Sequence, residues 1–316
     1  MTPPRIGITF GDPGGIGPEI VLKSIFSGNL NTRNRYVIFG SEEIFDRCFA
    51  ALKLNRTPPV ECEYIHVSCQ TSHLVEGASG EENGRVSFEA FNQAVNAARR
   101  GRLDAVVTAP VSKHSWNMAG IKWAGHTEFL NSLYPGIIMS FWSENLRVAL
   151  FSHHIPLSEA VKRVNRVDLE QFIRRLHGFI GEVDSTPYTY LISGLNPHAG
   201  ESGLLGCEEE DAITPAVEAV RTSGISIEGP YPPDIVFRKA LAKHDRFVVA
   251  LYHDQGLIPF KLDAFDSGVN ATLGLPFVRT SPDHGTAFDI AGSSSANPES
   301  MIQAIKLADG FISSQA

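Results

Sequence analysis

The sequence predicts an α/β fold built around a largely parallel β-sheet. Short apolar runs rich in β-branched or aromatic residues, each bounded by turn residues, alternate with segments of helical periodicity. Such alternation is typical of sheets in which helices join consecutive parallel strands. The 316 residues and the hydrophobic content of 43% are enough to bury a large core, in one large domain or two smaller ones.

Five runs are predicted to be buried strands, because they are short, apolar and flanked by turn residues. They are residues 5–10, 36–40, 104–109, 188–194 and 247–252. In a further segment, residues 136–157, two apolar runs meet at the sequence Ser-Glu-Asn. This pattern predicts a β-hairpin within the middle third of the chain.

Two segments are predicted to be amphipathic helices. In residues 87–101, Ser87 is the expected N-cap and Gly101 follows the last turn. In residues 208–224, carboxylates cluster at the expected N-terminus and Gly224 ends the pattern. We therefore interpret the acidic run as a helix start rather than a metal cluster. Because no repeat or long linker is evident, a second domain is expected to be interwoven with the first.

Composition and net charge exclude several classes of function. The net charge of −8 and the pI of about 5.8 disfavour nucleic acid as a partner, because an acidic surface repels phosphate backbones. The apolar runs are too short to span a bilayer, and the N-terminal residues do not resemble a signal peptide. Without a CxxC pair the thiols are expected to be reduced, and we expect a cytoplasmic protein. The cysteines are Cys48, Cys62, Cys69 and Cys207.

Three histidines follow strand-like runs. His154 comes after residues 147–151, and His198 and His253 come after two of the predicted strands. In open α/β sheets ligands bind beyond the carboxyl ends of the strands. Three neutral imidazoles suit a divalent ion such as zinc. The alternative is that each is an unrelated loop residue, because their spacing matches no short zinc motif.

Other polar residues suggest an anion or cofactor site. The glycine-rich segment 11–20 follows the first strand and opens a helix, so its N–H groups are able to approach an anion, although a tight turn is an equal alternative. Residues 125–129 place an imidazole beside a hydroxyl. Arg279 stands in an apolar stretch, where an arginine needs a partner such as an anionic ligand. For Arg279 and for Lys261, a plain surface charge is the alternative.

Taken together, the motifs resemble the 4-hydroxythreonine-4-phosphate dehydrogenase (PdxA) family of vitamin B6 biosynthesis. They occur in the family's order from residue 11 to residue 292. They are GDPGGIGPE, TAPVSK, GHTEFL, HIPL, NPHAGE, YHDQGL and GVNATLGLPFVRTSPDHGTAFDIAG. Within the last of these, HGTAFDIAG is also similar to the adenosine-binding loop of isopropylmalate and isocitrate dehydrogenases.

The resemblance implies an isocitrate/isopropylmalate dehydrogenase-like α/β fold. It would have two interwoven α/β/α domains, with the active site in the cleft and at the interface of a homodimer. Residues 1–120 with 255–316 would bind the cofactor, and residues 121–254 would bind metal and substrate and form the dimer. These boundaries are approximate.

The resemblance also implies roles for single residues. The metal ligands would be His154, His198 and His253; of the neighbouring pair only His154, not His153, fits HIPL. Asp234 and Lys261 would be catalytic, with the general base left open between Asp234 and a metal-bound water. Substrate contacts would be His126, Thr127, Lys261, Asn270 and Arg279. Cofactor contacts would be Asp12, Gly14, Gly15, His284, Gly285, Thr286 and Asp289.

The implied reaction is an NAD-dependent oxidation of 4-phosphohydroxy-L-threonine at C3, assisted by one divalent ion (Zn, Mg or Co). The resulting β-keto acid would lose carbon dioxide to give 3-amino-2-oxopropyl phosphate. NAD is expected rather than NADP, because Asp289 matches the position that accepts the adenosine ribose. In addition, no lysine or arginine lies between Arg279 and Lys306.

Four alternatives stay open. A catabolic relative would oxidise threonate or erythronate 4-phosphate with the same metal and anion sites. A relative acting on an aromatic dihydrodiol carboxylate would not need the phosphate anchors. A zinc hydrolase would also use three histidines, but it leaves HGTAFDIAG unexplained. A non-catalytic binding module would have no use for the complete set of motifs.

Overall fold

The computed structural model describes residues 2–315, and the chain leaves one structural unit and later returns to it. Unit 1 comprises the residues up to Ile137 together with those from Gly274 onward, and unit 2 comprises Ile138–Leu273. The boundaries lie C-terminal to the approximate positions expected from the sequence. Whether the two units divide cofactor binding from metal binding stays a prediction.

Unit 1 contains a five-stranded portion of sheet with the order β3-β2-β1-β4-β11, in which every neighbouring pair is parallel. Ile8 at its centre pairs with Ile38 on one side and Val107 on the other. The predicted strands near residues 5, 36 and 104 are thereby confirmed. The strands are β1 (Arg5–Thr9), β2 (Arg35–Gly40), β3 (Glu61–His66), β4 (Ala105–Thr108) and β11 (Val278–Pro282).

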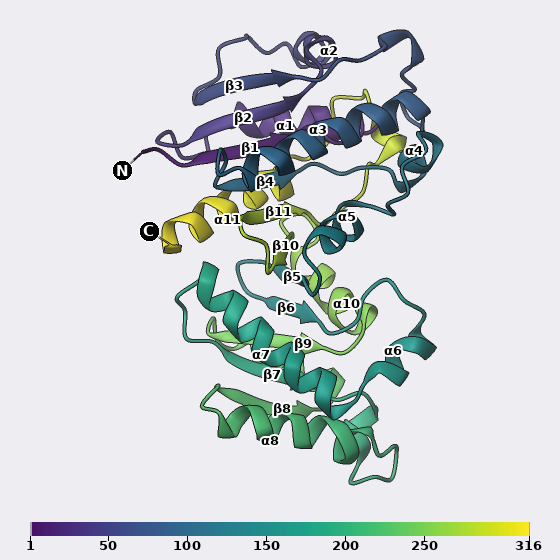
Figure 1. Ribbon diagram of the computed structural model, residues 1–316, viewed down its shortest axis with the longest axis vertical. Coiled ribbons are helices and arrows are strands. Elements are labelled where there is room, and N and C mark those ends of the chain that lie inside the picture. Colours follow the sequence, from purple (N-terminus) through teal and green to yellow (C-terminus); the bar gives the residue numbers. More distant parts are fainter. Residues whose placement is uncertain (1, 316) are drawn as a thin grey trace. The chain divides into compact units, whose positions relative to one another are not determined.

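Helices cover both faces of this sheet, which explains why every residue of β4 is buried. The helix α3 packs on β1, β2 and β4 and lies in front of these strands in Figure 1, while α11 packs on β11 and β4. The helices of unit 1 are α1 (Gly17–Ile25), α2 (Glu42–Leu52), α3 (Glu81–Arg99), α4 (Lys113–Met118), α5 (His126–Leu133) and α11 (Glu299–Gln315), with short 3-10 turns at Thr71–His73 and Phe288–Ile290.

The helix predicted over residues 87–101 begins earlier than expected. Its N-cap is Gly80, so the prediction that Ser87 caps it is wrong. Ser87 is instead buried within the helix, where its hydroxyl donates to Gly84 O at 3.1 Å and accepts from Trp116 Nε1 at 3.0 Å. The predicted end is right: the helix stops at Arg99, before a left-handed Gly101.

Unit 2 contains the strand order β10-β5-β6-β9-β7-β8. The predicted hairpin is confirmed, because β5 and β6 pair antiparallel and are joined by a tight turn. From β6 through β9 and β7 to β8 the pairing is parallel, whereas β10 pairs antiparallel with β5. The strands are β5 (Ile138–Trp142), β6 (Arg147–Leu150), β7 (Thr189–Ser193), β8 (Ile227–Tyr231), β9 (Arg246–Ala250) and β10 (Val269–Leu273).

In unit 2, α9 and α10 pack with β5, β6, β7 and β9 around a core of apolar side chains. The predicted helix over residues 208–224 is confirmed with one refinement: it opens with a π turn, Glu209–Ile213, and ends before a left-handed Gly224. The helices are α6 (Leu157–Arg163), α7 (Arg166–Val183), α8 (Thr214–Thr222), α9 (Pro233–Leu241) and α10 (His253–Ala264), and a short 3-10 turn spans Pro197–Gly200.

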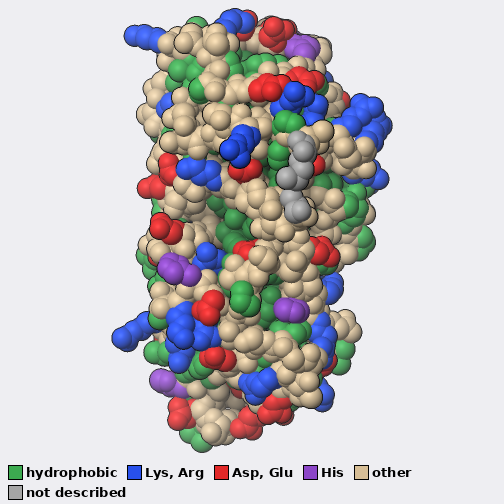
Figure 2. Space-filling model, turned by 90° about the vertical axis from the view of Figure 1, so that its left-hand side faces the viewer, with side chains coloured by type: hydrophobic (Ala, Val, Ile, Leu, Met, Phe, Trp, Pro, Cys, Tyr) green, Lys and Arg blue, Asp and Glu red, His purple; other side chains and the backbone are tan. Residues whose placement is uncertain are grey.

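The distribution of surface charge, the character of the helices and the state of the cysteines were compared with what the sequence predicts. On the face shown in Figure 2, the basic and acidic side chains of the described residues are interspersed. None of the helices within residues 2–315 combines the length and apolar character needed to cross a membrane. All four cysteines are free thiols, as expected.

Candidate functional site

The three candidate metal ligands follow three adjacent parallel strands of unit 2. In the order of the sheet, β6 leads to His154, β9 to His253 and β7 to His198. Because the strands are parallel, their carboxyl ends meet at one edge of the sheet. The fold therefore brings the three histidine-bearing loops to the same edge of unit 2.

Two of these histidines share a cavity of about 250 Å³. The rings of His154 and His253 are 5.7 Å apart between centroids. His253 Nδ1 lies 2.6 Å from Asp254 Oδ1, a carboxylate contact of the kind that orients a metal-binding imidazole. The sequence analysis did not identify Asp254. His153 also lines this cavity, with its ring 5.3 Å from that of His154.

The third histidine does not line this cavity. Within residues 2–315, no three His, Cys, Asp or Glu side chains converge closely enough to hold a metal ion. The donor chemistry still suits a divalent ion, because imidazole is a good ligand for zinc and cobalt. In the described part of the chain, suitable ligand types thus lie at one sheet edge without three of them converging.

Two of the three histidines have a left-handed backbone. The φ angle is 48° at His154 and 54° at His198. The turn that carries His198 continues left-handed through residue 203, with φ between 44° and 83° at all six positions 198–203. Only Gly200 and Gly203 in this run are glycines. For other residues this conformation costs about 1–2 kcal/mol each, so the surrounding structure must hold the turn in place.

Hydrogen bonds from buried polar side chains connect the backbones of the three histidine-bearing loops. Ser152 Oγ donates to Leu251 O at 2.7 Å, which joins the His154 loop to the His253 loop. Gln255 accepts from Leu251 N at 2.7 Å and donates to Gly194 O at 2.8 Å, which joins the His253 loop to the start of the His198 loop. The sequence analysis missed Ser152 and Gln255, because their partners are distant backbone atoms.

The remaining predicted residues of unit 2 occupy different places. Asp234 is exposed in the first turn of α9, directly after β8, and so lies at the same sheet edge as the histidines. Lys261 is partly buried on α10, two turns after His253. Asn270 is 7% exposed within β10, opposite Phe141 of β5.

In unit 1, a buried polar cluster forms around Arg279, which is 4% exposed on β11. Its Nη2 donates to Thr108 Oγ1 at 2.7 Å and lies 3.3 Å from His126 Nδ1. Thr108 Oγ1 is 3.5 Å from the same nitrogen. The predicted contacts Arg279 and His126 are therefore neighbours, and the predicted Thr127 is buried beside them on α5. The sequence analysis missed Thr108, the last residue of β4.

This cluster combines a buried cation with a neutral imidazole. Burial, and then the Arg279 charge, hold the pKa of His126 well below 6.5. Burial also lowers the pKa of Arg279 to about 10, against the effect of Glu128. His126 is packed against Phe91, with ring centroids 4.4 Å apart. A desolvated guanidinium beside hydroxyl and imidazole donors is suited to a phosphate or carboxylate oxygen.

The glycine-rich loop after β1 uses its N–H groups internally. Gly14 N donates to Asp12 Oδ1 at 2.8 Å, Gly15 N to Asp12 O at 3.1 Å, and Ile16 N to Thr286 O at 2.9 Å. A Cβ on Gly15 would lie 2.5 Å from Thr286 O. The glycines therefore allow close packing of this loop on the HGTAFDIAG loop, and this arrangement favours the tight-turn alternative over an anion cradle. A cofactor contact from Asp12, Gly14 or Gly15 stays a prediction.

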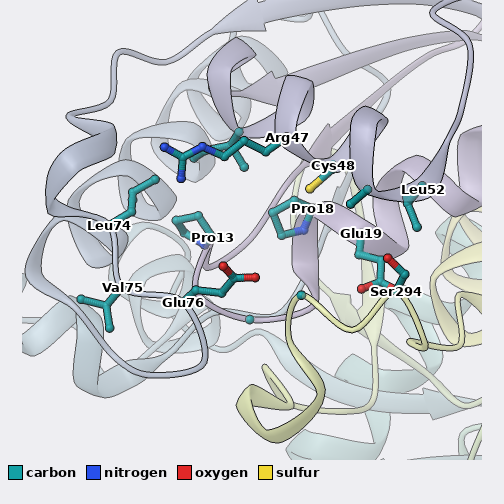
Figure 3. A pocket seen from close by; sticks show the side chains of 14 residues that line it. Pro13, Pro18, Glu19, Arg47, Cys48, Leu52, Leu74, Val75, Glu76 and Ser294 are labelled. Carbon is teal, nitrogen blue, oxygen red and sulfur yellow. The ribbon is translucent and has the colours of Figure 1, made fainter.

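The HGTAFDIAG loop follows β11 at the carboxyl edge of the unit 1 sheet, and it contains His284, Gly285, Thr286 and Asp289. Asp289 is exposed in the 3-10 turn Phe288–Ile290, ten residues before α11 begins, so it does not cap that helix. Figure 3 shows a cavity of about 340 Å³ beside this loop, bordered by Pro13, Arg47 and Glu76. Of the predicted cofactor residues, only Gly15 lines it.

Comparison with known proteins identifies relatives along nearly the whole chain. The family model described as pyridoxal phosphate biosynthetic protein PdxA matches residues 32–308. A 4-hydroxythreonine-4-phosphate dehydrogenase of Desulforapulum autotrophicum is 38% identical, over 96% of this chain and 94% of the relative. A D-threonate 4-phosphate dehydrogenase of Pectobacterium atrosepticum is also 38% identical, over 96% and 98%.

Solved structures agree with this assignment. A crystal structure of 4-hydroxythreonine-4-phosphate dehydrogenase from Klebsiella pneumoniae superposes with a TM-score of 0.87 at 36% identity, covering 99% of both chains. The isocitrate dehydrogenase of Methylococcus capsulatus, at 15% identity and a TM-score of 0.51, shows the fold alone. The predicted isocitrate dehydrogenase-like fold is thereby confirmed, and the chain belongs to the PdxA family of pyridoxal phosphate biosynthetic proteins.

Proposed function

We propose that the protein is an NAD-dependent and divalent-metal-dependent dehydrogenase of a four-carbon hydroxy-acid 4-phosphate, with 4-phosphohydroxy-L-threonine as the first candidate. Oxidation at C3 yields a β-keto acid, whose decarboxylation gives 3-amino-2-oxopropyl phosphate. The observation that carries the proposal is the placement of His154, His198 and His253 after three adjacent parallel strands, in a chain that matches the PdxA family model over residues 32–308.

The side chains of unit 1 support the binding of a phosphorylated acid. Arg279 supplies a permanent charge, Thr108 orients it, and His126 and Thr127 add further polar contacts. When bound, the divalent ion supplies Lewis acidity toward the substrate hydroxyl and NAD accepts the hydride. Lys261 and Asn270 of unit 2 are proposed as further substrate contacts. Asp234, at the sheet edge of the histidines, is proposed as a catalytic group.

A homodimer is part of this proposal, because within residues 2–315 of one chain the three histidines do not converge. The helix α10, which begins at His253, exposes Ile258 and Leu262 by 61% and 84%, and its C-cap Phe265 is 73% exposed. These positions lie on one face of the helix, whereas the opposite face contributes to the core. An exposed apolar stripe next to an incomplete site supports a second copy as its partner.

The second candidate substrate is D-threonate 4-phosphate, which has a hydroxyl in place of the amino group. The relatives named D-threonate 4-phosphate dehydrogenase are as similar to the chain, at 38% identity, as the 4-hydroxythreonine-4-phosphate dehydrogenase of Desulforapulum autotrophicum. Nothing in the buried cluster of unit 1 distinguishes the two substrates, because its donors recognise the anionic groups that they share.

The test is NADH formation on a panel of four-carbon hydroxy-acid 4-phosphates, with and without the amino group, in the presence and absence of a divalent ion. We expect metal-dependent NADH formation with at least one member, and the preferred member identifies the substrate. Binding of NAD by calorimetry separates this proposal from a zinc hydrolase. Absence of both NAD binding and NADH formation across the panel would contradict the proposal.

A further inference from the structure

The turn that presents His198 is an unusual piece of backbone. Residues 198–203 all have positive φ, and four of the six are not glycine. Four local hydrogen bonds link its backbone: Ala199 N to Asn196 O at 3.1 Å, Glu201 N to His198 O at 3.4 Å, Leu204 N to Glu201 O at 3.3 Å and Leu205 N to Gly200 O at 3.0 Å. Because left-handed residues other than glycine are strained, such a segment also depends on contacts from outside it.

One buried side chain makes several of these contacts. Glu209 is 3% exposed at the start of the π turn that precedes α8. Its Oε1 accepts from Leu195 N and from Asn196 N, both at 2.8 Å, and its Oε2 accepts from Asn196 Nδ2 at 2.9 Å. Three donors thus satisfy a buried carboxylate at the point where the chain enters the turn.

The same carboxylate also contacts the far side of the turn. A Cβ on Gly200 would lie 2.8 Å from Glu209 Oε2, and a Cβ on Gly194 would lie 3.1 Å from Oε1. The carboxylate is therefore packed between the two glycines that flank His198 in the sequence. Its neighbour Glu208 makes one contact with this segment, from Oε2 to Asn196 Nδ2 at 2.7 Å, whereas Glu210 is exposed.

We infer that Glu209 is the positioning residue that holds the His198 turn in its left-handed conformation and so presents the imidazole for metal binding. The inference rests on the proposed role of His198 as a metal ligand. Glu209 acts through the backbone of the turn: its oxygens accept from Leu195 and Asn196 rather than from the imidazole. Partners that hydrogen-bond a metal-ligating side chain directly change metal affinity by about 10–100-fold in other proteins, and we expect a residue that holds the backbone of the ligand to reach the lower end of that range.

The test compares Glu209→Gln with the matched control Glu210→Gln, which removes an exposed carboxylate from the same π turn. Two quantities are measured in the full-length protein: Co²⁺ affinity of the metal-free protein by competition with a chelator, and hydrogen exchange of the amides in residues 195–206. We expect Glu209→Gln to weaken Co²⁺ binding at least about tenfold and to accelerate exchange in that segment. Glu210→Gln should leave both within about twofold of the unmodified protein.

Glu209→Ala removes all three acceptor contacts. It should therefore weaken Co²⁺ binding and accelerate hydrogen exchange in residues 195–206 more than Glu209→Gln does. If it does not fold, Glu209→Gln alone decides. Unchanged exchange and unchanged Co²⁺ affinity in Glu209→Gln would overturn the inference. If the unmodified protein binds no Co²⁺, the proposed metal dependence fails instead, and the exchange measurement still shows whether Glu209 holds the turn.

Discussion

The buried cluster of unit 1 and the histidine loops of unit 2 prepare binding groups in opposite ways. In unit 1, Thr108, His126 and Arg279 lie on or directly beside regular elements and contact one another. In unit 2, His154 and His198 are exposed and have a left-handed backbone, and buried side chains stabilise the loops that carry them by hydrogen bonds to backbone atoms. In unit 1 the polar side chains thus fix one another, whereas in unit 2 the backbone is fixed and the imidazoles stay exposed, as the proposed metal site requires.

The largest expected effect is loss of a histidine ligand in unit 2. His198→Ala should remove the bound divalent ion and lower turnover at least about a thousandfold, because the Lewis acid is lost. The fold should remain intact, since the side chain is exposed. Metal content per protomer, steady-state rates and circular dichroism check this.

His153→Ala against His154→Ala is the matched pair for the same prediction, since both side chains line one cavity. His154→Ala should behave like His198→Ala, and His153→Ala should be far milder. Full activity in His198→Ala or in metal-free enzyme would show that these loops do not bind a catalytic ion.

In unit 1, Arg279→Met should weaken substrate binding by about 30-fold or more, because a buried charged donor to an anion is worth about 2 kcal/mol or more. NAD affinity should change by no more than about twofold, roughly 0.4 kcal/mol. Isothermal titration with substrate and with NAD checks the difference. Arg279→Lys is the control, and it should only partly restore binding, because a lysine lacks the planar fork of donors. Substrate affinity within about twofold of the unmodified protein would mean that the cluster is only structural.

A smaller effect is expected at the exposed Asp289. We predict a preference for NAD over NADP of at least about tenfold, roughly 1.4 kcal/mol, because a carboxylate beside the ribose repels a 2′-phosphate. Asp289→Asn should narrow the preference, since it keeps the shape and removes the charge. Steady-state efficiencies with both cofactors decide this, and comparable efficiency in the unmodified enzyme would place Asp289 away from the ribose.

The smallest effect concerns stability and pH. The pKa of His126 is lowered in the folded protein, so below pH 6.5 the unfolded chain binds a proton that the folded chain does not. The free energy of unfolding should therefore be highest above pH 6.5 and fall as the pH decreases. His126 contributes at most about 1.4 kcal/mol to this fall for each pH unit.

Urea unfolding at several pH values measures this slope. His126→Gln removes the titrating group. The slope of its unfolding free energy against pH should therefore be shallower, by the amount that corresponds to up to one bound proton. Equal slopes in the two proteins would show that His126 titrates normally when folded.

Much of the fold could be predicted, because its signals are local. The five predicted strands and the hairpin are apolar runs with turn residues at their ends, and the structure contains all of them. Four strands were not predicted. β3 is mostly exposed and polar, and β8 contains Gly229 and Pro230, so neither is an apolar run. β10 and β11 are buried, but polar residues such as Asn270 and Arg279 interrupt their apolar pattern. The start of α3 was misplaced because Ser87 looks like a cap locally, whereas the hydroxyl is needed by Trp116.

The candidate site was only partly predictable. The histidines were found because each follows a strand, a relation visible in the sequence. Glu209, Gln255 and Ser152 were not found, because their hydrogen bonds are made with backbone atoms of other loops. In the proposed function the three imidazoles converge only with a second copy, and no pattern that we used within one chain predicts such a contact.

We propose that unit 1 binds the anion with residues of one chain, whereas the metal site takes histidines from two chains. Purified heterodimers test it most directly, each pairing two of the variants His154→Ala, His198→Ala and His253→Ala. If one histidine comes from the partner, two of the three pairings leave one complete site per dimer and recover about half of the unmodified activity. Recovery in none of the pairings, with the heterodimers folded, would show that each site is built within one chain.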